Sequence, residues 1–101
     1  MRILVFFDLP TTSYVAQRDY TLFRRFLIKN GFIMLQESVY SKLALNNTVA
    51  DLIKEKIKKN KPQDGIVQML TITEKQFAKM DLLIGNIQTE IIDNDKKLVI
   101  L

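Results

Sequence analysis

Hydrophobic residues stand in unbroken runs in some stretches of the chain and at helical spacing in others. The first run, Ile-Leu-Val-Phe-Phe over residues 3–7, contains no polar position and ends at Asp8. Such a run is typical of a strand covered on both faces, so it predicts a central strand of a sheet. Pro10 cannot donate to a strand ladder, which ends the strand near Leu9 and places Asp8 at the rim of the sheet.

Residues 14–30 carry apolar side chains at helical spacing. The hydroxyls of residues 11–13 are candidate N-caps, and Gly31 is expected to close the helix in the left-handed conformation. An apolar arc lies opposite a basic stripe, which predicts one buried side and one solvent-facing side. The apolar arc comprises Val15, Ala16, Tyr20, Leu22, Phe23, Phe26 and Leu27, and the basic stripe comprises Arg18, Arg25 and Lys29, with Arg24 on a flank.

Three further runs predict strands. Residues 32–36 and 38–42 are separated only by Glu37, which requires a very tight turn or a bulge. Residues 66–72 form the next apolar run, and a Thr-x-x-Gln capping box at 73–76 then predicts a short helical turn.

A second helix is predicted to open at residues 46–48, with Thr48 and Asp51 spaced as a capping box. Its end is rich in lysine, which complements the negative end of the helix dipole; the alternative is a dedicated nucleic-acid patch. Its buried stripe is predicted to be Val49, Leu52, Ile53 and Ile57.

The predicted order βαββαβ indicates an α+β, ferredoxin-like domain over residues 1–101, with both helices on one face of the sheet and the other face bare. Further strand pieces are predicted at residues 82–84, 87–92 and 96–101, and the chain ends in Leu-Val-Ile-Leu. An exposed edge strand of this composition would invite aggregation. We therefore predict a homodimer whose sheets pack face to face, with a C-terminal strand at about 96–101 pairing across the subunits. Alternatively, this strand completes the sheet of its own subunit.

The chain of 101 residues contains no cysteine and no histidine. This excludes thiol and imidazole nucleophiles together with thiolate and imidazole metal sites, and leaves carboxylates, which favour hard cations such as Mg²⁺. Asp8 is the candidate ligand. The absence of cysteine favours a reducing cytoplasm as the compartment. No apolar stretch approaches the ~20 residues of a membrane span, so we expect no contact with membranes.

Charge is distributed unevenly. Residues 1–61 hold 11 Lys and Arg against 5 Asp and Glu, a net charge of +6, whereas residues 62–101 hold 4 against 6, a net charge of −2. An excess of cations on the N-terminal side indicates an anionic partner, nucleic acid before membrane. The alternative is a solvated lysine-rich surface.

Three features now occur together: a strand ending in Phe-Phe-Asp at 6–8, a helix that carries Arg18 and closes at Gly31, and Gln-Glu-Ser-Val-Tyr at 36–40. In combination they resemble the small CRISPR-associated adaptation protein, the non-integrase partner of the CRISPR integrase, in the form found beside type II effector nucleases. The Gln-x-Ser-Val-aromatic element is the more specific signal, because many strands end in Asp.

The resemblance implies a ferredoxin-like homodimer that lies between two dimers of the CRISPR integrase and holds duplex DNA, the prespacer, in spacer acquisition. It also implies, as the alternative, a metal-dependent endonuclease on RNA or DNA in which Asp8 of both subunits holds one Mg²⁺ per dimer. Tyr40 stands where the family more commonly has Phe, and Leu35 stands where many relatives have Arg. No phosphate contact is therefore carried over to position 35.

The residues favour the DNA-holding scaffold, because only Asp19 and Glu37 are acids near Asp8 in sequence and no general base is evident. Asp8 is the candidate catalytic and metal-binding residue, with a loop cap as its other interpretation. A toxin-like ribonuclease acting on messenger RNA is a third class. The candidate phosphate-binding residues are Arg18, Arg24, Arg25, Lys29 and Lys42.

Overall fold

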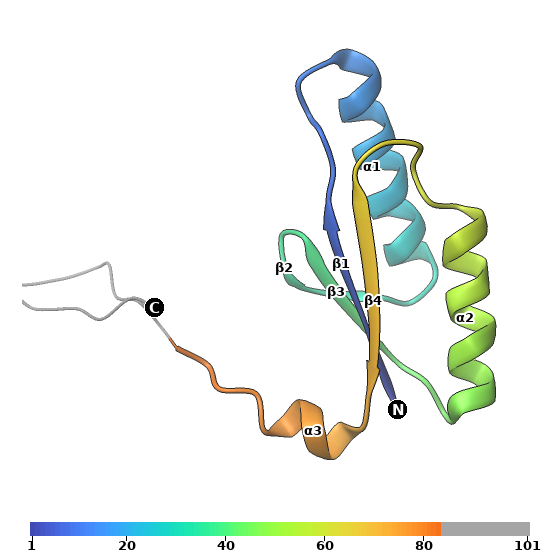
Figure 1. Cartoon of the computed structure of the whole chain (residues 1–101), viewed down its shortest axis with the longest axis vertical. Coiled ribbons are helices and arrows are strands. Elements are labelled where there is room, and N and C mark those ends of the chain that lie inside the picture. The colour runs from blue at the N-terminus through green and yellow to red at the C-terminus, as the bar shows by residue number, and fades with distance from the viewer. Residues whose placement is uncertain (84–101) are drawn as a thin grey trace, which may run out of the picture.

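The computed structural model describes residues 1–83 (Figure 1). The strands are β1 (Arg2–Asp8), β2 (Ile33–Gln36), β3 (Val39–Leu43) and β4 (Ile66–Ile72), and the helices are α1 (Tyr14–Lys29), α2 (Asn47–Lys59) and α3 (Glu74–Ala78). The predicted order βαββαβ is confirmed. Leu82 and Leu83 belong to no strand, contrary to prediction. The other predicted strand pieces, including the one at 96–101, lie outside the described residues.

One antiparallel sheet with the order β2-β3-β1-β4 forms the centre of the domain. The strand β1 lies between β3 and β4, so the prediction of a central strand from its unbroken apolar run is confirmed. In the ladder, Leu4 stands opposite Ser41 of β3 and Leu70 of β4, and these three side chains share one face of the sheet. That face, the open face, is turned away from α1 and α2.

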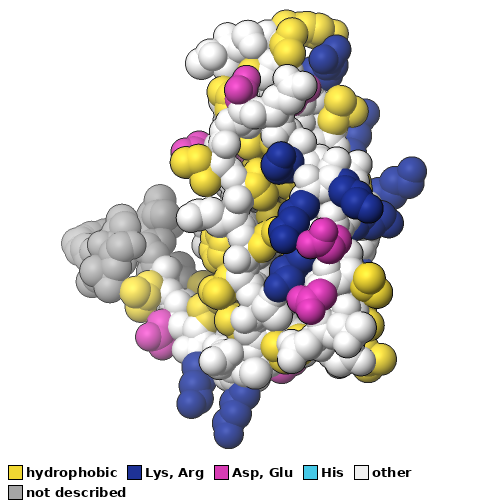
Figure 2. Space-filling model, turned by 45° about the vertical axis from the view of Figure 1, so that its right-hand side comes forward, with side chains coloured by type: hydrophobic (Ala, Val, Ile, Leu, Met, Phe, Trp, Pro, Cys, Tyr) yellow, Lys and Arg dark blue, Asp and Glu magenta, His cyan; other side chains and the backbone are white. Residues whose placement is uncertain are grey.

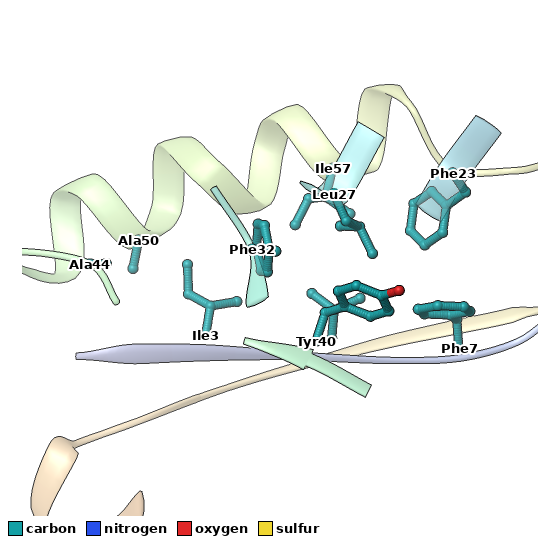
Figure 3. Packing of buried hydrophobic residues seen from close by; sticks show 10 residues of the cluster. Ile3, Phe7, Phe23, Leu27, Phe32, Tyr40, Ala44, Ala50 and Ile57 are labelled. Carbon is teal, nitrogen blue, oxygen red and sulfur yellow. The ribbon is translucent and has the colours of Figure 1, made fainter. Parts of the chain in front are cut away.

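The hydrophobic core lies between the other face of the sheet and the two long helices (Figure 3). Leu27 points from α1, and Ile57 from α2, toward Ile3 and Tyr40 of the sheet. The ring of Phe7 stacks on the ring of Tyr40 with centroids 5.6 Å apart and meets Phe23 edge-on at 5.3 Å. Aromatic packing therefore fixes the end of β1 next to Asp8.

Both ends of α1 follow the prediction. The Ser13 hydroxyl accepts a hydrogen bond from the Ala16 amide at 3.0 Å, and Gly31 adopts a φ of 89° after the helix. The expected Thr48 capping box of α2 is wrong, although the helix opens within residues 46–48: the cap is Asn46, whose side-chain oxygen accepts from the Val49 amide at 2.9 Å. Asn caps helices better than Thr, so the helix begins ahead of Thr48.

Both predicted apolar arcs are too wide. In α2, Leu52 is 67% exposed and Ala50 is 1% exposed, because Leu52 stands five residues before the buried Ile57, about 140° round the helix, and Ala50 about 20° from it. In α1, Leu22 stands at the same separation before Leu27 and is also exposed, as is Val15. The sheet covers only the narrow side of each helix that faces it.

The remaining turns are close to prediction. The strands β2 and β3 are joined by two residues, Glu37 and Ser38, and the expected irregularity is a shift of register between Met34 and Gln36. The capping box at the start of α3 is confirmed, with mutual hydrogen bonds of 3.0 and 2.9 Å between Thr73 and Gln76.

An ion pair that the sequence did not indicate holds α3 to the sheet. Two nitrogens of Arg2 donate to the two carboxylate oxygens of Glu74, each at 2.8 Å, and the Arg2 guanidinium lies 4.3 Å from the centre of the Phe77 ring. Arg2 also donates to the Ser41 hydroxyl at 3.2 Å. Bidentate pairing and a cation–π contact together place α3 at the Arg2 end of the open face.

Candidate metal site and nucleic-acid interface

Asp8 is the last residue of β1, and its side chain is exposed on the open face of the sheet. Within residues 1–83 its carboxylate accepts no hydrogen bond and forms no ion pair. The interpretation of Asp8 as a loop cap therefore has no partner in this part of the chain. Its oxygens are free to meet a cation or a donor from outside.

Asp8 is one of the residues that line a shallow hollow of about 290 Å³ at its end of the sheet. Gly65, with a φ of 97°, passes so close that a Cβ there would lie 2.7 Å from the Asp8 carbonyl oxygen. Asp8 also pairs with Ile66 in the ladder, so β4 and the loop before it together hold the backbone of Asp8. The hollow is lined by Phe6, Phe7, Asp8, Ser38, Val39, Ile66 and Gln68.

The donor set of one chain does not complete a metal site. Among the described residues, no group of three or more His, Cys, Asp and Glu is placed to hold a metal ion. Asp19 lies instead beside Arg18, with its Oδ1 3.9 Å from the Arg18 Nη2. Because Mg²⁺ prefers six oxygen ligands, Asp8 fits such an ion only when a second carboxylate, waters or phosphate oxygens join it from outside this chain.

Three of the predicted phosphate-binding residues lie together. Arg18, Arg25 and Lys29 are exposed on the side of α1 opposite Phe23 and Leu27, at positions separated by seven and four residues. Arg18 is loosely paired with Asp19, while Arg25 and Lys29 form no ion pair within residues 1–83. The structure thus keeps the three cations of the basic stripe on one exposed side of α1.

Arg24 is not part of this stripe. It lies half-buried on a flank of α1, where its Nε donates a hydrogen bond to the phenol oxygen of Tyr40 at 2.8 Å. Tyr40 is fully buried in the sheet. Sequence spacing separates Arg24 from the stripe but gives no signal for this contact between α1 and β3.

Lys42 also lies apart from the stripe. It stands opposite Ile3 in the ladder, on the helix side of the sheet, and its ammonium reaches Gly31 just after α1. It borders a hollow of about 230 Å³ together with Lys56, one of the lysines near the end of α2 that are expected to complement the helix dipole or, alternatively, to bind nucleic acid. On the side of the molecule that carries α2, several Lys and Arg side chains lie together with two acidic side chains among them, beside exposed hydrophobic side chains (Figure 2).

The open face of the sheet carries large hydrophobic side chains. Ile33 is 66% exposed and Leu70 is 50% exposed, and both alternate with the core-facing positions of their strands. Leu43 and Ile66 are exposed as well. The predicted bare face is therefore apolar, and Asp8 lies at one end of it. None of the helices described in residues 1–83 is long and apolar enough to cross a membrane.

Comparison with known proteins gives a consistent result. The family described as CRISPR associated protein Cas2 matches residues 1–80 of the chain. A protein of Treponema denticola named CRISPR-associated endoribonuclease Cas2 is 54% identical over 101 residues, which cover 100% of both chains. A protein of the same name from Streptococcus mutans is 46% identical over 101 residues, which cover 100% of this chain and 93% of the relative.

A solved structure supports the fold. The crystal structure of Streptococcus pyogenes Cas2 at pH 6.5 matches with a TM-score of 0.62 over 82% of this chain and 99% of that one. Its sequence identity of 13% limits this likeness to the fold. The α+β, ferredoxin-like architecture expected from the sequence is the one that this neighbour shares.

Proposed function

We propose a function for this chain from its family, since it belongs to the family of CRISPR associated protein Cas2. In this proposal the chain is the spacer-acquisition subunit that holds duplex DNA by its phosphate backbone. In this role a homodimer bridges two dimers of the CRISPR integrase and positions the prespacer between them. The family resemblance drawn from the sequence is confirmed. The DNA-holding role and the partners are our proposal.

The single observation that carries the proposal is the line of Arg18, Arg25 and Lys29 along the exposed side of α1. These cations lie on a rigid helix and are free to meet phosphates, because only Arg18 has an acidic neighbour in the described residues. Contacts of this kind position a duplex without distinguishing its bases. Arg24 on the flank of α1 and Lys42 beside Gly31 are proposed as two further phosphate ligands.

The dimer is proposed on the apolar character of the open sheet face. If two copies packed face to face about a two-fold axis, the same hydrophobic patch would be buried on each subunit. This patch comprises the exposed residues Ile33, Leu43, Ile66 and Leu70. Asp8 lies on this face, so the packing would bring two Asp8 carboxylates to one interface. The C-terminal strand at about 96–101 is proposed to pair across the same dimer.

Binding to DNA is tested with a labelled duplex at several salt concentrations. Replacing Arg18, Arg25 and Lys29 by Ala is expected to weaken binding and to reduce the slope of log K against log[salt] by roughly 0.9 for each phosphate that is no longer neutralised. The matched control replaces the exposed lysines Lys59, Lys75 and Lys79 by Ala, which removes the same charge from α2, α3 and their ends. Equally weakened binding in both triple variants would contradict a dedicated surface on α1.

The role in spacer acquisition is tested by integration of a short duplex with the neighbouring integrase. We expect the wild type and Asp8→Ala to integrate equally, and the triple α1 variant to fail. Loss of integration in Asp8→Ala with an intact dimer would instead make Asp8 part of the function.

The second candidate function is Mg²⁺-dependent cleavage of RNA or DNA through paired Asp8 residues. It is favoured by one observation: a carboxylate without a partner in residues 1–83, fixed at the end of a central strand beside a hollow on the apolar face. A bound Mg²⁺ would activate water and neutralise charge on the phosphate. The relatives from Treponema denticola and Streptococcus mutans are named endoribonucleases, which is consistent with this candidate.

A further inference from the structure

Arg24 differs from the other cations of α1 in how its side chain is held. Its Nε donates to the Tyr40 phenol oxygen at 2.8 Å, whereas Arg25 and Lys29 make no side-chain hydrogen bond within residues 1–83. The guanidinium has five N–H donors, and this bond uses one of them. Within residues 1–83 the two Nη groups make no further hydrogen bond, so they remain for a ligand, in the forked geometry that matches two oxygens of a phosphate.

The acceptor for this bond is itself immobile. Tyr40 is 0% exposed and pairs in the ladder with Val5 of β1 and Met34 of β2. Its ring stacks on Phe7 at 5.6 Å, and Figure 3 shows its oxygen pointing toward the Phe7 end of the core. The phenol oxygen therefore has one position, set by three strands, and the head group of Arg24 is tied to it.

We propose that Tyr40 is a positioning residue for nucleic-acid binding: its buried hydroxyl holds Arg24 ready to grip one backbone phosphate at a defined place. This inference rests on the proposed DNA-holding function and names the fixed anchor within it. The side chains of the basic stripe can adjust to the duplex, so they contribute electrostatic attraction to its phosphates. Arg24 fixes the position of the duplex along the protein, because it contacts one phosphate at a defined place.

Holding the Arg24 side chain in place before binding should increase the affinity for a duplex. Immobilising a rotamer-rich side chain on binding costs about 0.5–1.5 kcal/mol, equivalent to about 2- to 12-fold in Kd, and the Tyr40 bond removes part of that cost before the duplex arrives. Tyr40→Phe keeps the ring, the stacking and the charge of Arg24 but deletes the acceptor. We expect it to weaken duplex binding within this range and to leave the salt slope unchanged.

The test is a double-mutant cycle on the full chain, with a labelled duplex and fluorescence anisotropy as the readout. Arg24→Ala should weaken binding and reduce the salt slope by roughly 0.9, and adding Tyr40→Phe to it should change nothing further. The matched control is Tyr20→Phe, which removes a hydroxyl from another tyrosine that contacts Phe7, at 5.9 Å between ring centres. This control should bind like the wild type.

A second variant keeps the inference testable if Tyr40→Phe impairs folding. Arg24→Lys retains the charge, but one ammonium group cannot bond Tyr40 and also bind two oxygens of a phosphate. The variant should therefore lose duplex affinity in the same range, while the slope of log K against log[salt] stays unchanged. The inference is overturned if Tyr40→Phe and Arg24→Lys bind like the wild type, or if Tyr40→Phe weakens binding equally when Arg24 is Ala. A wild type that does not bind duplexes would overturn the proposed function as well, which distinguishes the two failures.

Discussion

Gly65 lies against the backbone of Asp8 so closely that a methyl group on its Cα would stand 2.7 Å from the Asp8 carbonyl oxygen. Its φ of 97° is also one that L side chains rarely adopt. We expect Gly65→Ala to destabilise the domain by about 1–3 kcal/mol in urea unfolding and to displace Asp8. Gly31→Ala is the matched control, since Gly31 has a similar φ of 89° but faces only the flexible end of Lys42. Equal costs would mean that the contact with Asp8 does not matter.

The pairing of Arg2 with Glu74 predicts a pH dependence. Hydrogen bonding from Arg2 lowers the pKa of Glu74, helped by the guanidinium charge. Because the folded pKa lies below the unfolded one, the stabilisation is present above the ordinary glutamate value and is lost as pH falls through the folded value. The unfolding temperature of the wild type should therefore exceed that of Glu74→Gln above the ordinary pKa of glutamate, and the difference should disappear as the pH falls through the lowered pKa of Glu74. Glu55→Gln, which removes an exposed partner of Lys58 on α2, should keep the wild-type profile.

Two aliphatic residues of α2 should respond differently to truncation. Ile57→Ala removes a side chain that is 2% exposed in the core, at an expected cost of about 2–5 kcal/mol. Leu52→Ala removes one that is 67% exposed, at an expected cost within about 0.5 kcal/mol. Urea unfolding measures both. A large cost at Leu52 in the dimer but not in a monomer would place it at an interface.

The open face of the sheet predicts the effect of a buried charge on assembly. Leu70→Lys would place two ammonium groups in a symmetric interface and should raise the dissociation constant of the dimer by roughly a hundredfold or more. Sedimentation gives the mass, and circular dichroism checks that the monomer stays folded. Leu52→Lys adds the same charge to the exposed side of α2 and should leave the dimer intact. Dimers of normal strength in Leu70→Lys would exclude packing through this face.

Cleavage by paired carboxylates predicts a clear loss in Asp8→Asn. The variant keeps the size of the side chain but removes the charge that a hard cation needs, so Mg²⁺-dependent cleavage of labelled RNA or DNA should fall to the level seen with chelator. The unfolding midpoint should not change, because Asp8 is exposed and makes no ion pair in residues 1–83. Asp64→Asn, an exposed acid next to Gly65, should cleave like the wild type. Cleavage by Asp8→Asn above the level seen with chelator would contradict catalysis through Asp8.

The linear sequence determined the elements whose signals are local. An unbroken apolar run marked β1, Gly31 marked the end of α1, and Thr73 with Gln76 marked the start of α3, because each depends on neighbours in the chain. The position of Asp8 at the strand end followed from the same logic. The width of each buried arc did not, since Leu52 and Leu22 are apolar and helical in spacing yet face away from the sheet.

Tertiary structure alone decided which side chains meet. Arg2 bonds Glu74, which lies 72 positions away in the sequence, and Arg24 bonds Tyr40, which lies 16 positions away. No periodic pattern in the sequence indicates either contact. It also separated Lys42 from the cations of α1 by turning it to the helix side of β3. The physical reason is that strand order and helix rotation are set by burial of the whole core, whereas caps, turns and runs are set by the few residues around them.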